Sequence, residues 1–86
     1  MAVDQNENRV RDNVRRAIEV MTAWTVDPDK QFTWSRFVQN VTEEPDGAIQ
    51  MLMGFVTLGG ELLVGLEKAT GNTAPWHLQQ IAAKYA

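Results

Sequence analysis

The longest apolar stretch of the sequence, Ala48 to Leu66, limits the folds open to this chain more than any other segment. On a helical wheel of 100° per residue, its polar side chains fall in one narrow line, and almost all the rest of the circumference is apolar or glycine. Lys68, just past the stretch, continues that line, which is formed by Gln50, Thr57 and Glu61. Such a helix has to be covered by other helices of its own chain, by another subunit or by lipid.

A membrane span over residues 48–66 is one alternative, because about 20 apolar residues can cross a bilayer. Glu61 opposes it, since an acidic residue near the bilayer centre costs roughly 2.5–3.5 kcal/mol. The flanks of the stretch also lack a Lys/Arg cluster and an aromatic belt. We therefore expect a soluble central helix, with membrane insertion as the weaker alternative.

Four glycines lie inside this stretch, and each costs up to about 1 kcal/mol relative to alanine in a helix interior. They are Gly54, Gly59, Gly60 and Gly65. One interpretation is close packing, because a missing side chain lets another backbone approach. The other is a break at Gly59–Gly60 that divides the segment into two shorter helices. We favour one helix, bent at most.

Apolar residues spaced i, i+3, i+4 and i+7 predict three further helices. The first carries a stripe of six apolar side chains: Val10, Val14, Ala17, Ile18, Met21 and Trp24. Thr33 is the expected N-cap of the second helix, and Gly71 the expected C-cap of the third. Asn72 or Thr73 should cap the last helix, with Pro75 in its first turn. The expected helices cover approximately residues 4–23, 33–43, 46–70 and 73–85.

These elements predict an all-α fold, a small four-helix bundle-like domain that comprises residues 1–86. The central, nearly all-apolar third helix should run through the middle of a bundle made by the other three. Because the loops after the second and third helices are short, the helices that they join should pack roughly antiparallel.

Composition narrows the expected location and partners. The chain has no cysteine, which excludes disulfides and thiol chemistry and fits a reducing compartment. Its N-terminal residues are polar and lack an apolar signal core, so a cytoplasmic location is the default expectation. A net charge of −3 opposes non-specific binding to nucleic acid and to anionic membranes.

The sequence contains few residues that could carry catalysis. His77 is the only histidine and Ser35 the only serine, and neither lies in a catalytic or phosphate-binding motif. A lone histidine in a polar first turn is expected to face solvent. Asp27 and Asp29 with Glu43 or Glu44 could suggest calcium, but the EF-hand spacing and glycine are missing. We predict no enzyme activity, no catalytic or metal-binding residue, no cofactor and no small-molecule ligand.

The first helix carries four arginines that raise the alternative of a nucleic-acid-binding regulator: Arg9, Arg11, Arg15 and Arg16. On the wheel they form two pairs that flank the apolar stripe, so they do not make one basic face. Acidic residues four positions away, such as Asp12 before Arg16, should also neutralise them within the helix. Phosphate binding is therefore the weaker hypothesis.

The favoured hypothesis is a small non-enzymatic protein–protein interaction or regulatory protein, with the homodimer as the expected assembly. Its basis is the surplus of apolar circumference on a short chain, together with adaptable methionines. Glu61 either faces water or becomes a buried carboxylate that is paired with Lys68, Lys84 or an arginine of the first helix. The candidate interface residues are Met51, Met53, Gly60, Glu61, Val64 and Trp76.

Overall fold

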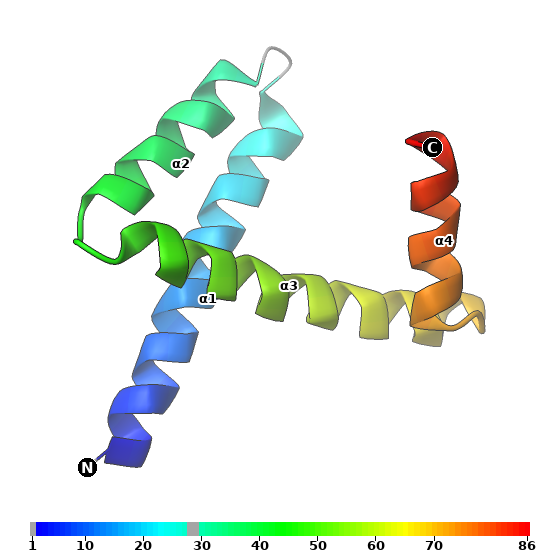
Figure 1. The fold of residues 1–86 in the computed structure, drawn as a ribbon, viewed down its shortest axis with the longest axis horizontal. Coiled ribbons are helices and arrows are strands. Elements are labelled where there is room, and N and C mark those ends of the chain that lie inside the picture. The colour runs from blue at the N-terminus through cyan, green and yellow to red at the C-terminus, as the bar shows by residue number, and fades with distance from the viewer. Residues whose placement is uncertain (1, 28–29) are drawn as a thin grey trace.

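The computed structural model describes residues 2–27 and 30–86, and this part of the chain forms four α-helices (Figure 1). They are α1 (Ala2–Val26), α2 (Gln31–Thr42), α3 (Gly47–Thr70) and α4 (Ala74–Lys84). The all-α class is confirmed, and so is a single third helix, because α3 continues without a break through Gly59–Gly60. The turn expected at Pro28 and Asp29, and with it the Asp29 ligand of the calcium hypothesis, lies outside the described residues.

The joint between α3 and α4 has the caps that the sequence indicates. Gly71 adopts a left-handed φ of 77°, and its N–H donates to the Glu67 carbonyl at 2.8 Å. Only glycine takes this conformation readily, so α3 ends here. Thr73 then caps α4, its Oγ1 accepting the Trp76 N–H at 3.3 Å, with Pro75 in the first turn.

The start of α2 differs from the prediction that Thr33 is its N-cap. The helix begins at Gln31, after Lys30, whose φ of 64° is left-handed. The Thr33 N–H donates to Oδ2 of Asp27 at 2.9 Å. Asp27, six residues earlier in the sequence, therefore does the capping that the Thr33 side chain was expected to do.

The core is small and lies where α3 crosses α1. Its fully enclosed side chains are Ala17, Val20 and Met51, of which Met51 is 1% exposed. α1 and α2 lie side by side, and the first half of α3 runs across them (Figure 1). Half-buried side chains complete the cluster: Phe37, Val41, Phe55 and Leu58.

Two glycines allow this crossing. A Cβ on Gly54 would collide with the backbone carbonyl of Asn13 in α1, and a Cβ on Gly47 would collide with the backbone of Val41 at the end of α2. The close-packing interpretation is therefore confirmed for Gly54. The glycines further along α3 have no such neighbour, since nothing lies within 4 Å of a Cβ placed on Gly59, Gly60 or Gly65.

The third helix is central because it contacts each of the other three, but they do not enclose it as expected. Beyond the crossing, α3 extends away from α1 and α2, and α4 turns off its far end at a steep angle (Figure 1). Val56 is 69% exposed as a result. The predicted antiparallel packing of α3 against α2 and α4 is wrong, because α3 runs across α2 and α4 leaves α3 at a steep angle (Figure 1).

The apolar stripe of α1 was expected to be buried, but only part of it is. Ala17 is buried, but Val10 and Ile18 are exposed. The buried line of α1 instead includes Asn13 and Val20, because α3 approaches the side of α1 that Asn13 occupies. Much of the predicted stripe is therefore left without a partner in the chain.

The molecule is more extended than a compact domain of the same length. Its accessible surface is 6647 Å², whereas a folded monomer of 9.7 kDa has about 5,100 Å². Its radius of gyration is 14.9 Å, against about 12 Å for a compact domain of this length. Many of the large apolar side chains that this shape leaves exposed lie on α3 and α4.

Candidate functional site

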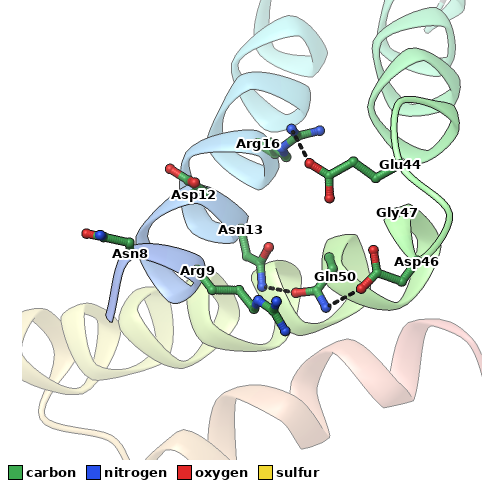
Figure 2. Close-up of a pocket in the computed structure, with 9 residues that line it drawn as sticks. All are labelled: Asn8, Arg9, Asp12, Asn13, Arg16, Glu44, Asp46, Gly47 and Gln50. Carbon is green, nitrogen blue, oxygen red and sulfur yellow. Dashed lines mark hydrogen bonds and ion pairs between the residues drawn. The ribbon is translucent and has the colours of Figure 1, made fainter. Parts of the chain in front are cut away.

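A polar hollow of about 510 Å³ lies at the junction of α1 with the turn between α2 and α3 (Figure 2). α1 contributes one side and the start of α3 contributes the other. Figure 2 shows Arg9 and Asn13 reaching toward Gln50, whereas Asn8 and Asp12 point away from it. The lining residues are Asn8, Arg9, Asp12, Asn13, Arg16, Glu44, Asp46, Gly47 and Gln50.

A chain of hydrogen bonds crosses this hollow. Nδ2 of Asn13 donates to Oε1 of Gln50 at 2.7 Å, and Nε2 of Gln50 donates to Oδ2 of Asp46 at 3.1 Å. Asn13 is only 6% exposed, so its amide needs this partner. Gln50 lies one helical turn before Gly54, which packs against the backbone of Asn13. The hydrogen bond between Asn13 and Gln50 therefore fixes the register of α1 on α3.

Arg16 joins α1 to the residues that follow α2. Its guanidinium donates to Glu43 Oε2 at 2.9 Å, to Glu44 Oε1 at 3.5 Å and to the Asn40 carbonyl at 3.4 Å. Arg16 was expected to pair with Asp12 in its own helix; it pairs with the end of α2 instead. Glu43 and Glu44, which directly follow α2, give Arg16 two carboxylate partners.

The chemistry of the hollow favours a structural role. Its two arginines, Arg9 and Arg16, nearly balance its three carboxylates. Arg16 is already paired with Glu44, and Asp12 points away from the hollow, so no cluster of one charge converges on a ligand. In the part of the chain that the structure describes, no group of three or more His, Cys, Asp or Glu side chains could hold a metal ion. The hydrogen bonds and ion pairs around the hollow join α1, the end of α2 and the start of α3.

We expect Asn13→Ala to lower the free energy of unfolding by about 1–3 kcal/mol, because Gln50 then loses its partner at a half-buried position. A double-mutant cycle with Gln50→Ala, followed by chemical denaturation, should give a coupling energy of about 0.5–3 kcal/mol. Asn8→Ala, in the same hollow but pointing away from Gln50, is the control and should change stability little. Additive effects of the Asn13 and Gln50 substitutions would contradict this assignment.

The four arginines proposed as phosphate contacts do not converge. Arg9 and Arg16 line the polar hollow, whereas Arg11 and Arg15 line a different groove. Glu19, four residues after Arg15, pairs between helices and not within α1, since it accepts from Arg36 of α2 at 3.1 Å. The division into two pairs seen on the helical wheel is therefore present in the fold.

The candidate interface residues fall into two groups. Met51 is a correction: it lies in the core, because it points at the α1 crossing, and it is not available to a partner. The remaining residues are exposed on α3 and α4: Met53, Gly60, Glu61, Val64 and Trp76.

His77 was expected to face solvent, and it is half-buried instead at the joint of α3 and α4. Its Nε2 lies 2.8 Å from Oγ1 of Thr70. Oε2 of Glu67 also accepts the Ala74 N–H at 2.6 Å, which satisfies a free backbone donor at the start of α4. These bonds set the direction in which α4 leaves α3.

A groove of about 650 Å³ lies between the first half of α1 and the middle of α3. Sequence reasoning missed it, because it is lined by the part of the α1 stripe that was assigned to the core. Val10 and Val14 supply apolar lining, and charged side chains of both signs flank them. The lining residues are Glu7, Val10, Arg11, Val14, Arg15, Thr57 and Glu61.

Comparison with known proteins gives no match: no protein-family model, no curated protein and no solved structure is similar to this chain. By length and composition α3 could cross a membrane, with a mean hydropathy of 1.6 and 11% of the apolar window buried. The core helix of a soluble protein passes the same test but is mostly buried. The exposed apolar surface of α3 is therefore the feature that any function has to explain.

Proposed function

We propose that this chain is a non-enzymatic helical interaction protein whose working form is a homodimer joined through α3 and α4. The observation that carries the proposal is the set of large apolar side chains left in water along these two helices. They are Ile49, Leu52, Met53, Val56, Leu62, Val64, Leu66, Trp76, Leu78, Ile81 and Tyr85. Patches of this extent on soluble monomers mark interaction sites.

The size of the surplus surface fits a second copy. The excess of about 1,500 Å² per chain over a compact monomer would amount to about 3,000 Å² for two chains. Obligate homodimers bury about 2,000–5,000 Å² in total, and their interfaces are apolar. Because each copy offers the same uncovered helices, one symmetric contact could cover both.

Lipid fits the same surface less well because of where α1 crosses α3. Gly54, at the crossing, is about 10 Å along the helix from Gly47, well inside a hydrocarbon layer of about 30 Å. A bilayer around α3 would therefore have to accommodate Arg11 and Arg15, which lie beside Glu61 in the α1–α3 groove. Buried charges of this kind are costly in a membrane.

Nucleic acid fits less well for a related reason. Arg16 is neutralised by Glu43 and Glu44, and the groove that holds Arg11 and Arg15 also holds Glu7 and Glu61. A phosphate backbone requires an uncompensated basic surface. The helical arrangement places acidic side chains beside the arginines instead.

Sedimentation equilibrium of the purified chain without detergent tests the proposal. We expect a mass of twice the 9.7 kDa chain, decreasing toward the chain mass on dilution. A monomer at every concentration would overturn it. Solubility only in detergent would favour the membrane alternative, and a dimer-free chain that binds duplex DNA at low salt would favour the nucleic-acid alternative.

A further inference from the structure

We propose that α4 is an exchanged arm: the α4 of each chain packs into the groove between α1 and α3 of the other. This inference rests on the proposed homodimer and assigns the contact that α4 makes in it. Two apolar stripes carry it, one lining the groove and one along α4, and neither has a partner within its own chain.

The groove presents an apolar strip of the width that a helix can cover. Val10 and Val14 are one helical turn apart on α1, and Ile18 continues the line with 46% of its surface exposed. A row at this spacing is the pattern against which the side chains of a second helix interdigitate. Thr57 of α3 closes the other side.

The arm presents the matching surface. Leu78, Ile81 and Tyr85 follow one another at three and four residues and form one stripe along α4. All three are exposed, and Tyr85 is 85% exposed. α4 contains no acidic residue, and Lys84 is its one formal charge at neutral pH. Glu7 and Glu61 of the groove are balanced by Arg11 and Arg15, so the match between the arm and the groove is apolar.

The arm cannot reach the groove of its own chain. α4 contacts α3 at Glu67 and Thr70, whereas the groove uses Thr57 and Glu61. At 100° per residue these two pairs lie roughly 130° apart around α3. Figure 1 shows the same arrangement, with α4 and the first half of α1 extending to opposite sides of α3.

A two-fold exchange fills the groove and covers the α4 stripe of both chains. Each copy donates one arm and offers one groove, so a closed dimer leaves no arm and no groove unfilled. The alternative of a simple α3–α3 contact would cover Leu52 and Val56 but would leave the α1 and α4 stripes in water. The exchange therefore covers the stripes of α1 and α4, and a contact between the two α3 helices in the same dimer would cover Leu52 and Val56.

Cysteine crosslinking tests the exchange, since the natural chain has no cysteine that could interfere. Chains carrying Ile81→Cys and chains carrying Val14→Cys are mixed, allowed to exchange subunits and oxidised. We expect a disulfide-linked heterodimer that forms about 100-fold faster than between free chains, because a docked arm holds the thiols at millimolar effective concentration. Leu78→Cys with Val10→Cys provides a second pair, in case one variant folds poorly.

Two control variants make the result specific. Gln80→Cys lies on the other side of α4, and paired with Val14→Cys it should crosslink no faster than free chains. Val56→Cys alone reports the α3–α3 alternative. A double variant, Val14→Cys with Ile81→Cys, tests for closure within one chain, and the exchange requires that its crosslinks join two chains.

The outcomes separate this inference from the proposed dimer. Crosslinking of both arm-to-groove pairs, with Gln80→Cys silent, supports the exchange. A dimer mass with no arm-to-groove crosslink, or with crosslinks within single chains, overturns the exchange and leaves the homodimer standing. A monomer mass for the natural chain overturns both.

Discussion

Ile81→Asp is expected to weaken the dimer about 100-fold to 10,000-fold in its dissociation constant. Burial of an isoleucine side chain contributes about 1.5–3 kcal/mol, and the substitution acts once in each of the two arms. The introduced carboxylate would also have to lose water inside the groove. Because Ile81 is exposed in the single chain, the fold of α1 to α3 should be unchanged, and sedimentation equilibrium with circular dichroism measures both effects.

Gln80→Asp is the matched control for this substitution. It places the same charge one residue earlier in α4, so it meets the same unfavourable helix dipole but lies outside the stripe. We expect the natural dissociation constant within about twofold, since exposed rim charges contribute little to affinity. Equal weakening by both variants would mean that helix destabilisation, and not loss of docking, separates the chains.

Gly54→Ala should destabilise the fold by about 1–3 kcal/mol, despite the better helix propensity of alanine. The new methyl group would meet the backbone of Asn13, which cannot rotate away as a side chain can. For a chain of this size the melting temperature should decrease by roughly 4–8 °C per kcal/mol. Thermal denaturation at a fixed chain concentration measures it.

Gly59→Ala on the same helix should have the opposite sign. No atom of another element lies within 4 Å of the position that its new methyl group would take, so only the gain in helix propensity of up to about 1 kcal/mol applies. A raised melting temperature for Gly59→Ala beside a lowered one for Gly54→Ala confirms the crossing. Stabilisation by both substitutions would show that α1 and α3 do not meet at Gly54.

Local signals in the sequence predict much of the secondary structure. Helical periodicity places four helices, and Gly71 and Pro75 place the joint between α3 and α4 correctly; of the two expected caps of α4, Asn72 and Thr73, the structure has Thr73. These signals succeed because capping depends on residues within one turn. The prediction of the start of α2 is wrong for the same reason, since the capping residue, Asp27, lies six residues before Thr33.

The packing of the helices could not be predicted in the same way. Periodicity identifies the apolar side of α1, but it does not say whether the partner of that side belongs to the same chain. Met51 and Met53 are the same residue type at nearly the same position, yet only Met51 points at α1. Asn13 is buried because a glycine in α3 brings the helices close, and that contact joins residues far apart in sequence.

The candidate surfaces likewise include one part that the sequence predicts and one part that depends on helix packing. The apolar surplus on a short chain indicates an interaction protein, and most of the predicted interface residues are exposed on α3 and α4. The groove between α1 and α3 could not be found, because it exists only through the angle at which the two helices cross. A wheel of a single helix contains no such angle.

Hydrogen exchange of the α4 amides at several chain concentrations tests most directly whether a second copy covers the uncovered helices. An 11-residue helix that contacts only the end of α3 is marginal by itself in water. We expect α4 to be protected nearly as well as α1 at high concentration and to lose that protection as the dimer dissociates on dilution. Protection of α4 that is absent throughout, or that does not change with concentration, would contradict the proposed dimer.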